Sequence, residues 1–188
     1  YLDMPELVEV ASAAAAARLG PTTALSTWEV ADRQGLSTLV EAAATSAARH
    51  FVSITSSEAW LAAPVQCVRA LLASDRLTCR DEAQVYAAAV AWLHARVPPL
   101  PAENAAALLS LVRYPLLSRE YYVGTVRAEP LLKTPSGTEM LMTALTEGTF
   151  GDSARRRIGF EQLYVLGGQN RHDGVLLDSV ERYDSASN

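Results

Sequence analysis

Apolar residues recur at helical spacing through most of this chain, from about residue 3 to about residue 148. One such segment carries Val40, Ala43, Ala44, Ala47 and Phe51. These positions are three or four residues apart and share one face of a helix. Short breaks separate the segments, and no alternating strand pattern competes with them. The spacing therefore predicts an all-α body of stacked antiparallel helical hairpins.

Capping residues and prolines mark where the predicted helices begin. The predicted starts lie, in chain order, at Asp3, Pro21, Ser37, Ser56, Pro64, Asp81, Pro101, Ser118 and Ser136. Three of these residues have Glu or Gln three positions later, which is the spacing of a capping box. Gly35 should end the second helix, because glycine readily adopts the left-handed conformation of a C-terminal cap.

Many predicted contact positions are alanine, which allows close helix packing but supplies little apolar area. Trp60, Trp92 and Phe51 are therefore expected to provide much of the burial. Tyr114, Tyr121 and Tyr122 cluster in the segment VRYPLLSREYY and are interpreted as core residues.

The pattern changes after Gly148. The segment GTFGDSARRRIGF has no apolar period and is predicted to be a linker, with Arg155–Arg157 interpreted as a solvated charge run. LYVLGG and VLLDSVERYD follow it, separated by the polar residues QNRHDG. Their β-branched and aromatic content predicts two strands joined by a long loop.

Composition argues against several classes of function. The net charge of −5 makes nucleic acid an unfavourable partner. No charge-free run of about eighteen apolar residues suggests a membrane span. Cys67 and Cys79 lack metal-ligand spacing and are predicted to be reduced and buried, while the histidines, His50, His94 and His172, are scattered. The sequence predicts no metal site, and the opening YLDMPEL suggests a piece of a longer protein.

The sequence also predicts no catalytic site and no cofactor. The isolated carboxylates fall at helix starts or on exposed faces, where the helix dipole explains several of them; they are Glu6, Glu9, Glu41, Glu82 and Glu103. No nucleophile–histidine grouping can be assembled from the scattered histidines. The pair Gly167-Gly168 lacks the surrounding pattern of a phosphate-binding loop.

Four segments in order resemble the BTB–BACK–Kelch family. They are LVEVASAAAAARLGPTTAL at 7–25, VADRQGLSTLVEAA at 30–43, ALLASDRLTCRDEAQVYAAAVAWL at 70–93 and LVRYPLLSREYY at 111–122. The chain departs from the family pattern at Gly20, Gln34 and Arg119, where the family usually has Asp, His and Pro. The resemblance implies a BACK domain and a eukaryotic source.

The C-terminal segment resembles the start of a Kelch repeat. Gly167, Gly168 and Tyr183 match the double glycine and the tyrosine of that motif. The resemblance implies that the predicted hairpin is a fragment of a β-propeller blade. The implied domains are a BTB/BACK junction helix pair at 1–34, a BACK body at 35–148, a linker at 149–162 and a partial first Kelch repeat at 163–188.

The resemblance also implies a function based on protein–protein interaction. Such proteins are substrate adaptors of cullin-3 ubiquitin ligases, which dimerise through a BTB domain and bind a protein substrate through the Kelch propeller. Residues 4–34 would face cullin-3, with Leu25 and Glu29 as candidate contacts. The alternative is an actin-binding cytoskeletal or transcriptional scaffold without ligase activity. Either function implies a cytoplasmic protein that can also be nuclear or cytoskeletal.

Overall fold

The computed structural model describes residues 5–150, 157, 163–169 and 176–183. Within them the helices are α1 (Pro5–Ala16), α2 (Ala24–Arg33), α3 (Ser37–Arg49), α4 (Phe51–Thr55), α5 (Glu58–Ala62), α6 (Val65–Ala73), α7 (Glu82–His94), α8 (Ala102–Leu109), α9 (Arg119–Gly124) and α10 (Pro135–Phe150). Three 3-10 helices, η1 (Tyr114–Leu116), η2 (Val126–Ala128) and η3 (Pro130–Lys133), connect α8 to α9 and α9 to α10. The strands are β1 (Leu163–Gln169) and β2 (Leu176–Tyr183).

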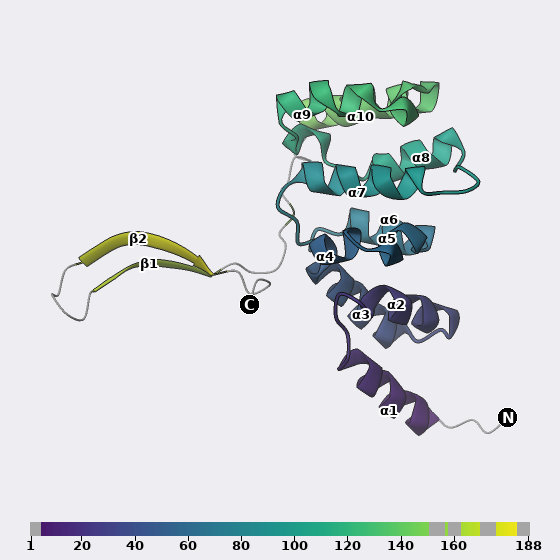
Figure 1. Cartoon of the computed structure of the whole chain (residues 1–188), viewed down its shortest axis with the longest axis vertical. Coiled ribbons are helices and arrows are strands. Elements are labelled where there is room, and N and C mark those ends of the chain that lie inside the picture. The colour runs from purple at the N-terminus through teal and green to yellow at the C-terminus, as the bar shows by residue number, and fades with distance from the viewer. Residues whose placement is uncertain (1–4, 151–156, 158–162, 170–175, 184–188) are drawn as a thin grey trace.

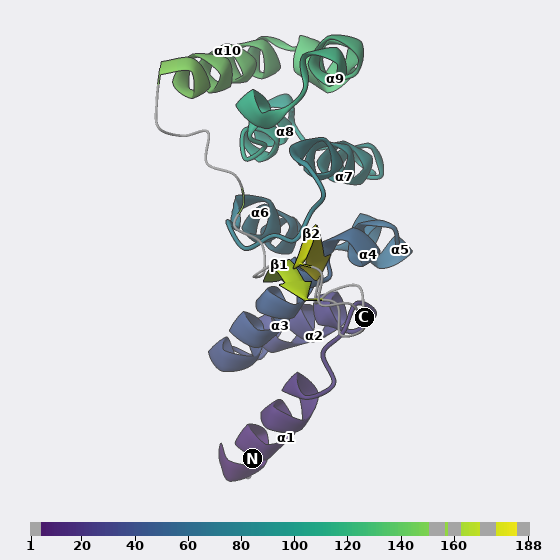
Figure 2. The same cartoon turned by 90° about the vertical axis from the view of Figure 1, so that its left-hand side faces the viewer.

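The helices stack into a column, with α1 at one end and α9 and α10 at the other (Figure 1). Consecutive helices α2 and α3 pack on each other, as do α7 and α8, while α10 lies on α8 and η3. The prediction of an all-α body built from stacked helices is confirmed. At the N-terminal end, α1 and α2 both contact α3, and α2 packs mainly on it (Figure 2).

One apolar core runs through the column. Phe51, Trp60 and Trp92 are completely buried, as predicted from the shortage of large side chains elsewhere. Phe51 meets Trp60 edge to face, with ring centroids 5.6 Å apart. The indole N–H of Trp60 donates to the Ala88 carbonyl at 2.9 Å, and that of Trp92 donates to the Ala63 carbonyl at 3.0 Å. These two bonds join α5 to α7 in both directions.

Three predicted helix starts are wrong. Ser56 follows the end of α4, and α5 begins at Glu58 with Ser57 before it. The second helix begins at Ala24 and not at Pro21, because the Thr23 hydroxyl ties the preceding turn together. It accepts from the Gly20 N–H at 3.0 Å and donates to the Arg18 carbonyl at 2.9 Å. The last helix begins at Pro135, and its cap is Thr134 where Ser136 was predicted.

The Thr134 hydroxyl accepts from the Gly137 N–H at 3.1 Å, which satisfies a free donor of the first turn of α10. Proline directly after the cap needs no N–H partner there. The predicted cap at Asp3 lies outside the described residues.

Other predicted ends are confirmed. Asp81 accepts from the Gln84 N–H at 3.0 Å, although the Gln84 side chain accepts from Arg80 and so completes the capping box one residue early. Ser118 accepts from the Tyr121 N–H at 3.1 Å. Gly35 has φ +68°, the left-handed conformation predicted for it.

The two strands pair antiparallel, from Leu163 opposite Tyr183 to Gln169 opposite Leu176. The register shifts between Leu166 and Gly168, so Gly167 lies at an irregularity of the ladder. The connecting residues 170–175 lie outside the described residues, as does most of the predicted linker. The assignment of this hairpin to a propeller blade stays a prediction.

Candidate functional site

The side chain of Arg157 is buried where three helices of the column end. It is 2% exposed, although Arg155–Arg157 was predicted to be a solvated run. That prediction is wrong for Arg157, and the other two arginines lie outside the described residues. Nothing in the spacing of three adjacent arginines identifies which of them is buried.

The guanidinium of Arg157 uses every donor it has. Nε and Nη2 donate to the two carboxylate oxygens of Glu82, at 3.0 and 2.8 Å. Nη1 donates to the carbonyls of Leu72 and Ser74 at 2.7 and 2.8 Å, and Nη2 also donates to the Leu111 carbonyl at 3.2 Å. A guanidinium has five N–H bonds in a fixed fork, and these five contacts match them.

Glu82, the first residue of α7, provides the negative charge of the site. Its place at a helix start agrees with the prediction, but it is 4% exposed and paired with Arg157, so the prediction that it is an isolated carboxylate is wrong. Its Oε1 also accepts from the backbone N–H of Arg113 at 2.9 Å. Charge-assisted bonds of this kind are the strong ones, and a paired buried carboxylate avoids the cost of an isolated charge.

The helix ends around the ion pair favour both charges. Glu82 lies at the N-terminus of α7, where the helix dipole is positive. The carbonyls of Leu72 and Ser74 lie at the C-terminus of α6, where the dipole is negative and carbonyls lack partners within the helix. The helix ends thus form a binding site for one arginine side chain.

A pocket of about 420 Å³ adjoins the ion pair, lined by residues 79–82, by Pro115 and Leu116, and by Arg157 itself. Burial raises the pKa of the Cys79 thiol to about 11, with a further contribution from Glu82. The thiol therefore stays protonated at neutral pH and is a poor nucleophile. The thiol that lines this pocket is therefore not an activated group.

A tyrosine cluster packs around Tyr86, one helical turn after Glu82 in α7. The rings of Tyr114 and Tyr121 both meet Tyr86 edge to face, with centroids 6.3 and 6.0 Å away. Burial raises the pKa of all three phenols. Tyr114 is buried and Tyr121 and Tyr122 are partly buried, which agrees with their interpretation as core residues.

The predicted partner contacts lie in different environments. Leu25 is 6% exposed and packs in the core, which leaves almost none of its side chain to contact a partner. The Glu29 side chain is 49% exposed and pairs with Arg33 one turn later at 3.4 Å. The neighbouring Val30 is 51% exposed. The sequence did not identify it as a candidate contact, because its helical position alone does not show whether another element covers it.

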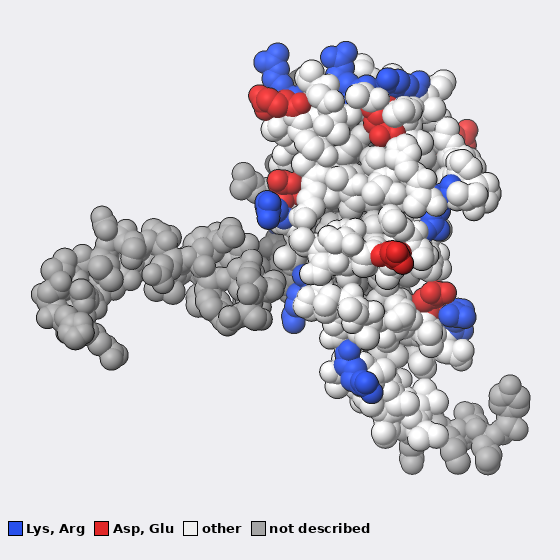
Figure 3. Space-filling view, in the orientation of Figure 1, with Lys and Arg blue, Asp and Glu red and all other residues white. Residues whose placement is uncertain are grey.

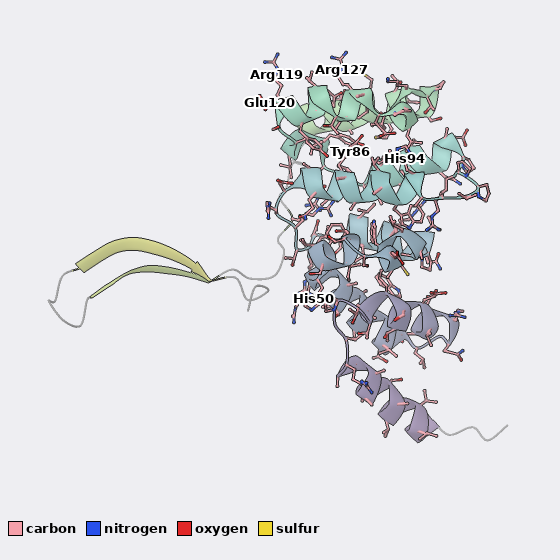
Figure 4. The ribbon with its side chains drawn as sticks, in the orientation of Figure 1. His50, Tyr86, His94, Arg119, Glu120 and Arg127 are labelled. Carbon is pink, nitrogen blue, oxygen red and sulfur yellow. The ribbon has the colours of Figure 1, made fainter. Side chains whose placement is uncertain are left out.

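The end of the column at α1 exposes large apolar side chains. Leu7, Val8 and Val10 are 60%, 46% and 67% exposed. Few charged side chains lie over α1 in Figure 3, whereas several gather over α9 and α10 at the opposite end. Arg119 and Arg127 project from that opposite end (Figure 4).

The part of the chain that the structure describes contains no cluster of three or more metal-ligating side chains. Among the same residues, no helix combines the length and apolarity that a bilayer crossing needs. His94 Nε2 and Glu129 Oε1 lie 3.0 Å apart, and the same Glu129 oxygen accepts from the Leu131 N–H at 3.2 Å at the start of η3.

Comparison with known proteins gives two matches in chain order. The profile of the BACK domain, "BTB And C-terminal Kelch", matches residues 24–127, and that of the Kelch motif matches residues 161–188. Kelch-like protein 7 of Rattus norvegicus and of Homo sapiens is 39% identical over 82 residues, which is 42% of this chain. Kelch-like protein 3 of Danio rerio is 43% identical over 70 residues, or 35% of this chain. These matches span only 13% and 11% of the relatives' own lengths.

Proposed function

The chain belongs to the family of proteins in which a BACK domain precedes Kelch motifs, and we propose that it is the connecting module of a substrate adaptor for a cullin-3 RING ubiquitin ligase. In this role the module is not catalytic and needs no cofactor. It holds a substrate-binding Kelch propeller at a fixed place relative to a dimeric BTB domain and the cullin. The site of action would be the cytoplasm.

The continuous core of the column is the observation that carries the proposal. Buried residues from α2 to η3 form one cluster, so these elements cannot move independently without breaking packed contacts. The BACK and Kelch matches occur in the order that such a connector requires. A rigid body between two binding modules fixes the distance between them.

The exposed apolar residues of α1 support a partner at that end of the column. Leu7 and Val10 expose more than half of their side chains, and a surface of this kind is typical of an interaction site when it is contiguous. Residues 4–34 would contribute to the cullin-3 groove as an amphipathic helix surface. Glu29 and Val30 are the exposed candidates on α2.

Cullin-3 capture by the full-length protein tests this function. The substitutions Leu7→Asp and Val10→Asp together should weaken cullin-3 binding at least tenfold, because charge would replace apolar contact area. Met142→Asp is the matched control, since Met142 is 65% exposed on α10 at the other end of the column. Equal affinity of all variants would contradict a cullin contact at α1.

The same preparation distinguishes the alternative function. Co-purification of cullin-3 with the unmodified protein supports the ligase adaptor. Co-sedimentation with actin filaments in the absence of any cullin-3 binding would support the cytoskeletal scaffold instead.

A further inference from the structure

We infer that the Glu82–Arg157 site is an anchor that sets where the Kelch region leaves the helical column. The inference rests on the proposed connecting role of the chain, and it assigns Arg157 as a positioning residue within that role. The Arg157 guanidinium donates hydrogen bonds to Glu82 and to backbone carbonyls at the end of α6 and just after α8.

The anchor joins segments that are distant in the sequence. Arg157 follows the end of α10, yet its partners belong to α6, α7 and the turn after α8. Figure 2 shows α10 at one end of the column and α6 towards the middle. The chain is thus fixed to the side of the column, at the level of α6 and α7.

The anchor shortens the length of free chain that precedes the Kelch region. The Kelch match begins at residue 161, eleven residues after Phe150 ends α10 and four residues after Arg157. Fully extended, eleven residues reach about 40 Å, whereas four residues reach about 14 Å. With Arg157 bound, the start of the Kelch region is confined to about a third of the distance that the free linker would permit.

The chemistry of the site selects arginine. A lysine ammonium has three donors and no planar fork, so it cannot match two carboxylate oxygens and three carbonyls together. Reversing the pair would place a carboxylate against the carbonyls of Leu72, Ser74 and Leu111, where only a donor is accommodated. We therefore expect Glu82→Arg combined with Arg157→Glu to fail to restore the anchor.

Trypsin reports directly on whether Arg157 is anchored. Cleavage after an arginine requires its side chain to enter the protease's specificity pocket, and a 2% exposed side chain cannot do so while bound. Glu82→Gln in the full-length chain should raise the rate of cleavage after Arg157 at least tenfold. Cleavage after the exposed Arg69 of α6 measures unfolding of the column, so the ratio of the two rates isolates release of the anchor.

Asp75→Asn is the matched control. Asp75 is a neighbouring carboxylate that pairs with Arg113, and none of the five hydrogen bonds of the Arg157 guanidinium reaches it. The Arg157 to Arg69 cleavage ratio should be unchanged in Asp75→Asn. Equal ratios in the wild type and Glu82→Gln, or an equal rise in Asp75→Asn, would overturn the inference.

Spin labels at Ser26 and Gln169 measure the positioning itself, with Cys67 and Cys79 replaced by alanine. Electron–electron distance measurements should give a distribution at least twice as broad in Glu82→Gln as in the parent chain. An unchanged distribution would show that Arg157 does not position the C-terminal region. Cullin-3 binding should be unaffected by Glu82→Gln, so failure of the anchor and failure of the proposed function are separate results.

Discussion

Gly137, in the first turn of α10, lies against the backbone of η3. A Cβ at this position would be 2.7 Å from the Leu132 Cα and 2.8 Å from the Leu131 carbonyl oxygen. Backbone cannot move aside as a flexible side chain can. Gly137→Ala should therefore lower the free energy of unfolding by about 1–3 kcal/mol, the usual cost of overpacking. Urea denaturation monitored by circular dichroism measures the change.

Gly124, at the end of α9, supplies the control for that substitution. A Cβ there would have no atom within 4 Å, and its φ is not positive. Gly124→Ala should leave stability unchanged or raise it by up to about 1 kcal/mol, because alanine lowers the entropy of the unfolded chain. If both substitutions had the same effect, steric contact with η3 would not be the cause.

We expect the two buried cysteines to make the protein less stable at alkaline pH. Burial raises the pKa of Cys67 and of Cys79 from 9.0 to about 11, so the folded state favours the neutral thiols. Their contribution to stability is complete below pH 9 and is lost as the pH rises towards 11. Urea unfolding at about pH 7.5, 9 and 10.5 should show this decline. Replacing both residues by alanine should reduce the decline above pH 9; an identical decline would assign it to other groups.

Burial of a polar residue was the property that sequence could not predict at this scale. Glu82 was expected to be an isolated helix-start carboxylate and Arg157 part of a solvated charge run, but the two side chains are buried and paired with each other. Their burial depends on a contact across 75 positions of the chain, and no local pattern encodes it. The burial of Trp60 and Trp92 was predictable, because large apolar rings leave water wherever the fold permits it.

The indole hydrogen bonds of Trp60 and Trp92 hold α5 and α7 together. Trp60→Phe keeps most of the buried ring but removes the 2.9 Å bond to the Ala88 carbonyl, which should cost about 0.5–1.5 kcal/mol, the usual net contribution of one hydrogen bond. Trp28→Phe is the control, because Trp28 is 6% exposed and no hydrogen bond from its indole is found among the described residues. Thermal unfolding should separate the two variants, and similar losses would mean that ring volume alone matters.

At the scale of elements, the sequence predicted that the helices exist. The residue at which each helix begins depended on tertiary contacts and was harder to predict. Asp81 and Ser118 cap their helices as the local pattern predicted. Pro21 does not start a helix because it lies inside a turn that Gly20 and Thr23 close. The short helices α4 and α5 show the same limit, since a five-residue helix has little periodicity from which to set its ends.

At the scale of the whole molecule, the anchor couples the C-terminal segment to the stability of the column. Arg157→Met would leave the Glu82 carboxylate buried without its cation, and breaking a buried pair in this way costs about 3–5 kcal/mol. Glu82→Gln in that background removes the uncompensated charge and keeps an oxygen to accept from the Arg113 N–H. The second substitution should therefore restore part of the stability that the first one lost.

A double-mutant cycle of these variants tests the coupling. Glu82→Gln should destabilise the chain that carries Arg157 and stabilise the Arg157→Met chain, with an interaction energy of about 1.5–3 kcal/mol. The same cycle with Asp75→Asn should give no interaction energy with Arg157→Met, because Asp75 pairs with Arg113 instead. Suppose that Glu82→Gln lowers stability with Arg157 and raises it with Arg157→Met, while Asp75→Asn shows no such reversal. The residues that fix the Kelch region would then also help to hold α6, α7 and α8 together. Equal effects of Glu82→Gln in both backgrounds would show instead that the column folds independently of the segment that follows it.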